Sequence, residues 1–195
     1  SRLSEGETHK PLLLYVGRLS VEKRIDWLHD VLTEMPDIRL AVVGDGPARK
    51  LLEDHFTGLP VVFTGYLKGQ ELADAYASAD IFAFPSANET FGIVVLEAMA
   101  SGLPIVVPDS GGVTDFVHHD RTGLVFKRES RVDFINCIRS LVQDRTRRSR
   151  LSSAGRAWAT DHDWDSTFMN LMQDYRELVR ERSTLHETEQ TRPWI

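Results

Sequence analysis

Short apolar runs alternate with longer amphipathic segments along the chain from Pro11 to about Leu141. Most of the apolar runs are too continuously hydrophobic for strands with one face in water, and such runs are typical of parallel sheets that helices cover on both faces. The predicted strands are Leu12–Val16, Arg39–Val43, Val61–Thr64, Ile81–Phe84, Ile105–Val107 and Gly123–Phe126. Helices are predicted between them, so the pattern indicates a doubly wound α/β fold with a parallel sheet.

After the last predicted strand, the sequence pattern indicates helices and then a polar tail. Arg145–Ala159 and Asp165–Arg182 have helical periodicity, whereas Ser183–Trp194 is polar and has none. We therefore predict one domain over residues 1–182 and a disordered polar tail over residues 183–195.

The composition is that of an ordinary globular protein and excludes several classes. Hydrophobic residues make up 42% and charged residues 27%, which disfavours wholesale disorder, and the formal net charge of -6 disfavours nucleic-acid binding by overall charge. The single cysteine, Cys137, lies in the helix-like run Phe134–Leu141, which excludes an internal disulfide and a cysteine zinc cage and fits a reducing compartment. No run approaches the roughly 20 apolar residues that span a bilayer, and Ser1–Lys10 has no apolar signal-peptide core. We expect a protein of the cytoplasm or an organelle stroma, soluble or peripheral to a membrane.

In doubly wound sheets the ligand binds outside the carboxyl ends of the strands, where loops lead into helix N-termini. Four loops at that edge are chemically unusual: Gly17-Arg18 through Lys23, Gly44-Asp45-Gly46-Pro47, Asn88-Glu89-Thr90-Phe91-Gly92 and Ser110-Gly111-Gly112. The candidate functional residues are therefore expected along one edge of the sheet.

The first loop places two cations after the first predicted strand. Ser20 is a good helix N-cap, which would put Lys23 at the third helical position, where the helix dipole disfavours a cation unless both share an anion. Arg18 and Lys23 would then clamp a diphosphate. The alternative, from this loop alone, is that both cations are solvated and that Glu22 offsets Lys23.

The second loop has the spacing Gly-x-Gly and a proline, Pro47, that suits the first position of a helix. It departs from a dinucleotide-binding fingerprint because Arg49 stands where the third glycine would fall, and no strand-end acid follows about 20 residues on. These departures disfavour a nicotinamide dehydrogenase and favour a turn that packs a helix on the sheet. In the fourth loop, Gly111 and Gly112 permit either a close approach to a ligand or a plain tight turn.

The third loop precedes a helix whose ends are well marked. Gly92 opens the predicted helix Ile93–Ala100, and Gly102 and Pro104 end it. The backbone N–H groups of residues 91–94 are free at the helix start and favour a pyrophosphate. Glu89 would then lie near a sugar, although acids at helix N-termini are also common without any ligand.

Glu97 lies inside this helix among apolar neighbours, where an unpaired carboxylate would be costly to bury. Helical side chains lean towards the N-terminus, so Glu97 points back to the loop, where a ribose diol would donate two hydrogen bonds. The alternative is that an arginine pairs with Glu97, but the apolar surroundings favour the ligand role.

Taken together, these motifs resemble the C-terminal domain of family 4 glycosyltransferases. The resemblance covers about Lys10–Tyr175, and the motifs that carry it are Gly17-Arg18 with Lys23, Gly44-Asp45-Gly46-Pro47, Pro85-Ser86, and Glu89 with Glu97 eight positions later. Within the family, Val61–Gly65 and Leu96–Gly102 look closest to sulfolipid synthases, which transfer sulfoquinovose from a UDP donor to diacylglycerol.

The resemblance implies a retaining GT-B enzyme, in which two Rossmann-like domains face a cleft and the C-terminal one holds the nucleotide sugar. Arg18 and Lys23 would bind the diphosphate, Glu97 the ribose, and Glu89 with the following backbone the sugar, while the base would lie near Gly65. The donor-binding residues that it implies are Gly17, Arg18, Lys23, Gly65, Tyr66, Glu89, Thr90, Phe91, Gly92, Ile93 and Glu97, with Arg18, Lys23 and Glu89 also catalytic. No metal or other cofactor and no protein nucleophile are implied, because the basic pair and the helix dipole stabilise the departing diphosphate.

The chain departs from the family pattern in two respects. Thr114-Asp115 stands where many relatives carry Pro-Glu after the double glycine, so a ligand role for Asp115 is not implied. The N-terminal acceptor domain, which often supplies a histidine, is absent, and His118 and His119 are expected to be solvated rather than catalytic. We therefore expect a fragment that binds the donor and has little or no transfer activity without that domain.

Other hypotheses remain open at this point. The same pocket would also suit a stand-alone nucleotide-binding module, whereas a GT-B epimerase or phosphorylase is less favoured because no pyridoxal-binding lysine pattern is apparent. UDP is preferred over GDP and ADP by resemblance alone. A peripheral membrane contact would use a basic cluster, with a solvated helix balanced by nearby acids as its alternative. The cluster consists of Arg145, Arg147, Arg148 and Arg150.

Overall fold

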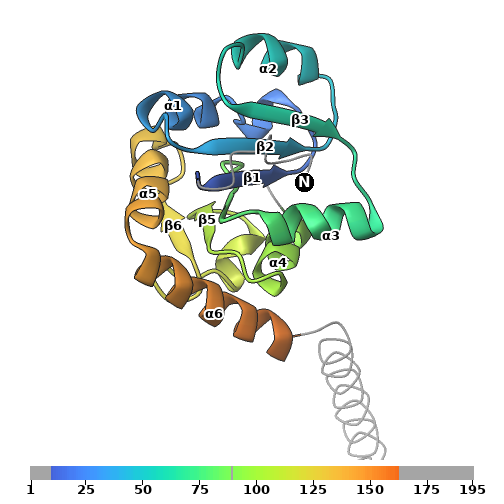
Figure 1. The fold of residues 1–195 in the computed structure, drawn as a ribbon. Helices are drawn as coiled ribbons and strands as arrows, with labels where there is room; N and C mark the ends of the chain where they lie inside the picture. Colours follow the sequence, from blue (N-terminus) through green and yellow to red (C-terminus); the bar gives the residue numbers. More distant parts are fainter. Residues whose placement is uncertain (1–9, 89, 163–195) are drawn as a thin grey trace, which may run out of the picture. The chain divides into compact units, whose positions relative to one another are not determined.

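The computed structural model describes residues 10–88 and 90–162. Within these residues, six parallel strands form one sheet in the order β3-β2-β1-β4-β5-β6 (Figure 1). The strands are β1 (Leu12–Val16), β2 (Arg39–Val43), β3 (Val61–Gly65), β4 (Ile81–Ala83), β5 (Ile105–Pro108) and β6 (Leu124–Phe126). The helices are α1 (Trp27–Glu34), α2 (Arg49–His55), α3 (Gly69–Ser78), α4 (Ile93–Ala100), α5 (Arg131–Gln143) and α6 (Arg145–Asp161), with short 3₁₀ turns η1 (Val21–Lys23) and η2 (Gly112–Asp115).

The predicted fold class is confirmed, and the strand boundaries agree to within one residue. β1 and β2 have the predicted bounds, β3 and β5 are each one residue longer, and β4 and β6 are each one residue shorter. α4 has its predicted bounds, and α6 runs on from the predicted end at Ala159 to Asp161. The predicted helix Asp165–Arg182, the domain end at residue 182 and the polar tail lie outside the described residues.

Helices cover both faces of the sheet, which explains why its strands are continuously apolar. β1 and β2 are buried along their whole length. α1 and α5 lie side by side on one face, and α3 and α4 lie on the other (Figure 1). Trp27 of α1 packs on Phe126 and Phe134, with ring centroids 6.2 and 6.0 Å away, and Arg131 of α5 forms an ion pair of 2.7 Å with Asp30 of α1. Burial and charge therefore both fix α1 against α5.

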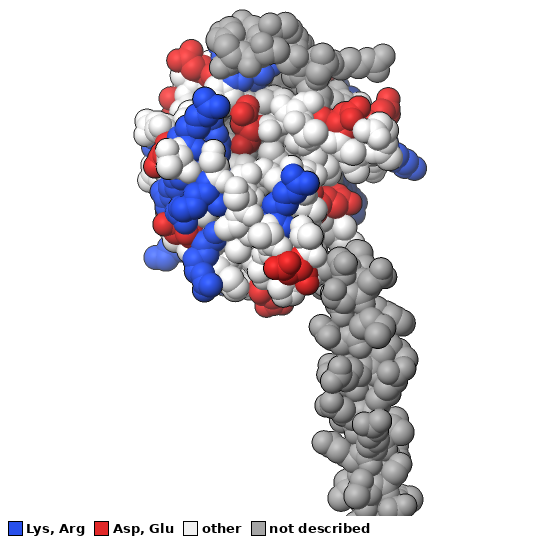
Figure 2. Space-filling model, turned by 60° about the horizontal axis from the view of Figure 1, so that its bottom comes forward, with Lys and Arg blue, Asp and Glu red and all other residues white. Residues whose placement is uncertain are grey.

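Charged side chains are unevenly distributed over the surface. Although the formal net charge is -6, Lys and Arg gather on one side of the face that carries α6 (Figure 2). The first turn of α6 contains arginines and no acid. None of the helices in the described part of the chain is long and apolar enough to cross a membrane.

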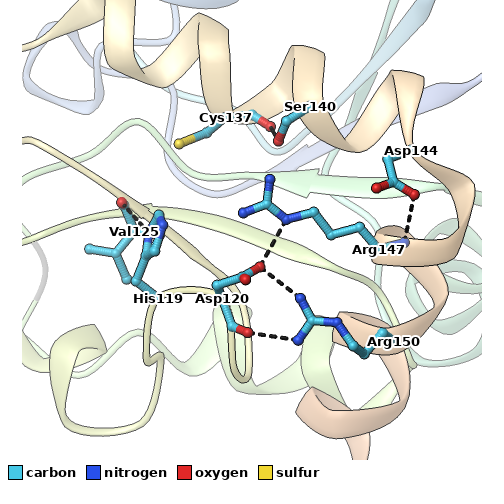
Figure 3. Close-up of polar contacts among 8 residues, drawn as sticks. All are labelled: His119, Asp120, Val125, Cys137, Ser140, Asp144, Arg147 and Arg150. Carbon is cyan, nitrogen blue, oxygen red and sulfur yellow. Dashed lines mark hydrogen bonds and ion pairs between the residues drawn. The ribbon is translucent and has the colours of Figure 1, made fainter.

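A single carboxylate fastens α6 to the loop that precedes β6. Asp120 Oδ1 accepts hydrogen bonds of 2.8 Å from Arg147 Nε and from Arg150 Nη2, and the Asp120 carbonyl accepts one of 2.7 Å from Arg150 Nη1 (Figure 3). Asp120 has a φ of 57°, in the left-handed region that Asp adopts more readily than most residues other than glycine, and the two arginines hold this turn in place. The hydrogen bond from Arg147, ahead of that from Arg150, lowers the pKa of Asp120 below its ordinary value of 3.8.

We expect Asp120→Asn to lower the free energy of unfolding at neutral pH, because the variant leaves Arg147 and Arg150 without their carboxylate partner. The pKa of Asp120 is depressed in the folded protein, so the Asp120 carboxylate contributes to the free energy of unfolding at pH values above its ordinary pKa of 3.8. This contribution is lost as the pH falls through the lowered pKa. The difference between variant and parent should therefore shrink in acid. Urea unfolding of variant and parent at neutral pH and at about pH 3 measures this difference in the free energy of unfolding. The exposed Asp37, changed to Asn, serves as the control, and a difference that does not depend on pH would contradict the assignment.

Candidate functional site

Two loops meet at the carboxyl edge of the sheet, where the strand order reverses. The chain passes from β1 towards β2 and β3 but from β4 towards β5 and β6, and ligands of doubly wound folds bind outside such a reversal. Lys23, after β1, donates a hydrogen bond of 3.1 Å from Nζ to the carbonyl oxygen of Asn88, after β4. The same ammonium lies 5.9 Å from the ring centroid of Phe84, within cation–π range. The first and third loops of the sequence analysis are therefore in direct contact.

Ser20 stands at the N-cap position as predicted, but the helix that follows it is only a single 3₁₀ turn. Residues 21–23 form the single 3₁₀ turn η1, Lys23 is its last residue, and Arg24 ends it at a φ of 52°. The Ser20 side chain makes no capping hydrogen bond. Its hydroxyl donates to Glu22 Oε1 at 2.6 Å, and this bond is the largest cause of the lowered pKa of Glu22. No helix dipole therefore repels Lys23. The turn instead directs its side chain to the third loop.

Gly17 and Arg18 continue from β1 along the second loop. The Gly17 N–H donates to the Val43 carbonyl at 3.0 Å, and the Tyr15 hydroxyl donates to the Arg18 carbonyl at 3.1 Å. These bonds fix the backbone, while the Arg18 side chain is exposed and has no hydrogen bond or ion pair to another described residue. The cation predicted to bind an anion is thus presented at the carboxyl edge.

The second loop packs against the first. The Leu19 N–H donates to the Asp45 carbonyl at 2.9 Å, and a Cβ on Gly46 would lie 2.3 Å from the Leu19 carbonyl oxygen, so only glycine fits there. The packing role favoured for this turn therefore holds, although the turn packs a loop rather than a helix. α2 begins at Arg49, so the prediction that Pro47 takes the first helical position is wrong.

The third loop brings backbone donors to the same edge. Gly92 is the N-cap of α4, which begins at Ile93. The backbone N–H groups of Ile93 and Val94 donate to no other residue that the structure describes. Two donors are therefore available at the helix start, where the dipole favours an anion.

Glu89 lies outside the described residues, so its sugar contact and its catalytic role stay predictions. The neighbouring Thr90 and Phe91 are described, and both are exposed. The fourth loop supports this segment, because a Cβ on Gly112 would lie 2.2 Å from the Thr90 carbonyl oxygen. Gly112 therefore allows the fourth loop to pack closely against the third loop.

Glu97 is half buried on α4, and its partner is a tyrosine. The Tyr76 hydroxyl donates to Glu97 Oε2 at 2.8 Å and lies 3.3 Å from the Val94 carbonyl oxygen. Burial, and then the hydrogen bond to Glu97, raise the pKa of Tyr76, so the phenol stays a donor over the whole working pH range. No arginine pairs with Glu97, and its Oε1 atom has no hydrogen-bond partner among the described residues. One carboxylate oxygen is therefore held and the other is available to a ligand.

Tyr76 is the residue that the sequence analysis missed. It lies on α3, is 2% exposed, and meets Glu97 only because α3 and α4 cover the same face of the sheet. The signal in the sequence was a tyrosine on the apolar side of a helix, since a buried phenol hydroxyl needs a partner. Which partner it finds depends on how the two helices pack, and this is not encoded in the local pattern.

Gly65 and Tyr66 lie at the same edge, at the end of β3. The Gly44 N–H donates to the Gly65 carbonyl at 2.9 Å, which ties this segment to the second loop. The Tyr66 side chain is 70% exposed. Its ring is thus available for stacking on a flat ligand group such as a base.

Three other residues singled out in the sequence lie away from this edge. His118 and His119 are exposed, as expected, in the loop that precedes β6. The Nδ1 atom of His119 lies 3.1 Å from the amide nitrogen of Val125 and 2.9 Å from the carbonyl oxygen of Val125 (Figure 3). Cys137 is buried on α5, and burial raises the pKa of its thiol to about 11. In residues 10–88 and 90–162, no group of three or more His, Cys, Asp or Glu side chains is placed to hold a metal ion.

The chain is similar in sequence to a described protein family and to named proteins. Residues 3–158 match the family model described as "Glycosyl transferases group 1". The sulfoquinovosyl transferase SQD2 of Arabidopsis thaliana is 46% identical over 166 residues, which cover 84% of this chain and 32% of that protein. A GDP-mannose-dependent alpha-mannosyltransferase of Mycolicibacterium smegmatis is 42% identical over 158 residues, which cover 76% of this chain and 40% of that protein. The chain therefore spans less than half the length of these relatives.

Solved structures have the same fold. Sucrose-phosphate synthase from Thermosynechococcus elongatus matches with a TM-score of 0.79 and 28% identity, over 89% of this chain and 47% of that one. The Anabaena protein HepE, solved in complex with UDP, matches with a TM-score of 0.78 and 24% identity, over 86% of this chain and 49% of that one. The family model and the relatives of known name together show that this chain belongs to the glycosyl transferases group 1 family, a family of GT-B glycosyltransferases.

Proposed function

We propose that this chain is the donor domain of a retaining glycosyltransferase and that it binds a nucleotide sugar, preferably a UDP-sugar, at the carboxyl edge of the sheet. The observation that carries the proposal is the contact of Lys23 with the Asn88 carbonyl. Through this contact a cation from the loop after β1 reaches the loop that opens α4, whose first N–H groups are available donors. A diphosphate needs this combination of charge and donors.

The proposed donor lies along the edge in a fixed order. The diphosphate is bound by Arg18, Lys23 and the backbone at Ile93, and the ribose donates to the available oxygen of Glu97. Glu89 binds the sugar beyond the diphosphate, and the base stacks near Tyr66. Catalysis in this proposal is electrostatic, because the cations and the helix N-terminus stabilise the charge on the departing diphosphate. The acceptor hydroxyl then bonds to the anomeric carbon on the face where the bond to the nucleoside diphosphate breaks, and its proton passes to the departing diphosphate. In this proposal no protein nucleophile is assigned, and the cations take the place of a metal ion.

The relatives support parts of this assignment to different degrees. The HepE structure contains UDP, which supports UDP as the nucleotide. A relative with 36% identity is named a phosphatidylinositol dimannoside mannosyltransferase, which supports a lipid acceptor. The relatives named GDP-mannose-dependent transferases make GDP the competing nucleotide. The acceptor half is proposed to lie on a second domain of the whole enzyme.

Calorimetric titration of the chain with UDP, GDP and ADP tests the proposed function. We expect measurable binding, tightest for UDP, and no sugar transfer from the corresponding nucleotide sugars to lipid acceptors by this chain alone. Absence of binding to all three nucleotides would overturn the proposal. Transfer by the chain alone would contradict the assignment of the acceptor site to a second domain.

We expect Lys23→Ala to weaken UDP binding by about tenfold to a hundredfold, the scale of a lost hydrogen bond between charged groups. Uridine binding should not change, because uridine has no phosphate for Lys23 to contact. Paired titrations with UDP and uridine measure the difference. Lys50→Ala is the matched control, because Lys50 lies on α2 and contacts Asp54. An equal loss of affinity for uridine would contradict the diphosphate assignment.

Glu97→Ala should weaken UDP binding by about 1–3 kcal/mol, because the ribose loses its acceptor. Tyr76→Phe should weaken binding less, since it removes only the bond that orients Glu97. In the Glu97→Ala background, Tyr76→Phe should cause almost no further loss of UDP affinity. This coupling distinguishes a role of Tyr76 in orienting Glu97 from a general destabilisation of the fold. Titration of all four proteins gives the coupling energy. Strictly additive losses would contradict the positioning role of Tyr76.

A further inference from the structure

A second pocket lies at the opposite edge of the sheet, where β1, β4 and β5 begin. Its volume is about 440 Å³, within the roughly 300–1,000 Å³ of small-molecule sites. The side chains that line it include Lys10, Asp80, Pro104, Arg145, Arg148 and Ser149. Because its walls come from the amino ends of the strands and from α6, the pocket is separate from the proposed donor site.

The four arginines in the first two turns of α6 divide into two pairs with different surroundings. Arg147 and Arg150 turn to Asp120, which offsets part of their charge (Figure 3). Arg145 and Arg148 line the pocket instead. Within residues 10–88 and 90–162, Arg145 has no hydrogen bond or ion pair from its side chain, and Arg148 has no carboxylate partner. The positive charge left unbalanced on α6 is therefore concentrated on its pocket side.

Backbone groups hold Arg148 in place for an anion. Its Nη1 atom donates to the Leu141 carbonyl at 2.9 Å and to the Val142 carbonyl at 3.4 Å, at the end of α5. These bonds fix the guanidinium without neutralising its charge, and the remaining N–H groups stay available. Arg145 and Arg148 also lie in the first turn of α6, where the dipole disfavours cations; the Asp144 carboxylate accepts the Arg147 N–H there at 2.9 Å but forms no ion pair with either guanidinium. A bound anion would balance the positive charge of these guanidinium groups and would also interact favourably with the dipole at the start of α6.

We propose that this pocket binds a phosphate group, either as a soluble phosphate ester or as the head group of an anionic lipid. The guanidinium groups of Arg145 and Arg148 and the exposed hydroxyl of Ser149 together offer more donors than the two oxygens of a carboxylate can accept, whereas a phosphate has three such oxygens. Arg145 and Arg148 against Asp80 leave the lining with a positive excess even without Lys10. Asp80 is partly engaged, because its Oδ2 atom accepts the Leu12 N–H at 2.9 Å.

The site is tested by titrating the chain with inorganic phosphate in the presence of excess UDP while the Nε–Hε NMR signals of Arg145 and Arg148 are followed. Both signals should shift. Arg145→Gln should weaken phosphate binding about tenfold, and the matched Arg150→Gln, which removes the same charge from the other side of α6, should leave it unchanged. Since Arg145 has no described side-chain partner, its loss should not alter the fold. The comparison of Arg145→Gln with Arg150→Gln reports on the pocket alone, so its outcome does not depend on whether UDP binds. The proposed phosphate site and the proposed donor site can therefore fail independently of each other.

Vesicles distinguish the two sources of phosphate. If the pocket takes a lipid head group, vesicles of phosphatidylcholine with phosphatidic acid bind the parent chain and Arg150→Gln but bind Arg145→Gln much less. If the pocket takes a soluble ester, the NMR shifts appear and vesicle binding does not depend on Arg145. Unshifted Arg145 and Arg148 signals, an equal loss in Arg150→Gln, or the same shifts with acetate at matched ionic strength would overturn the phosphate site.

Discussion

The carboxyl edge of this fold depends on β1 and β4 being neighbours in the sheet although β2 and β3 separate them along the chain. Their adjacency places the loop that carries Arg18 and Lys23 beside the loop that opens α4. The hydrogen bond from Lys23 to Asn88 closes the contact between them. Charge from one loop and backbone donors from the other thus meet at one place, which neither loop alone could achieve.

Close packing of the loops gives this edge its shape before any ligand binds. Gly46 lies against the carbonyl of Leu19, and Gly112 lies against that of Thr90, at distances that no side chain would permit. The Tyr76 hydroxyl likewise fixes one oxygen of Glu97. Groups that are already held lose little conformational freedom on binding, so the edge is suited to recognising one arrangement of charge and donors.

The sequence predicted the sheet well and the side-chain partners poorly, for physical reasons. Continuous apolar runs mark buried parallel strands, and glycine and proline mark both ends of α4, so these boundaries could be read from local patterns. The turn at residues 21–23 could not, because Arg24 ends it in a left-handed conformation that non-glycine residues seldom adopt. The pairing of Tyr76 with Glu97 joins two helices through tertiary packing, which periodicity does not report.

The same limit applies to α6, whose arginines look alike in the sequence. The fold separates them, because Asp120 reaches one side of the helix and offers nothing to the other. A chain with an overall negative charge can therefore carry a local positive excess, and the pairing of each cation decides where that excess lies. Among the described residues, cations without a carboxylate partner stand at both edges of the sheet, for example Arg18 at the carboxyl edge and Arg145 at the amino edge. An anion responds to the summed field of all these charges, so the pairing of each basic residue, and not only the number of basic residues, decides where the local potential is positive.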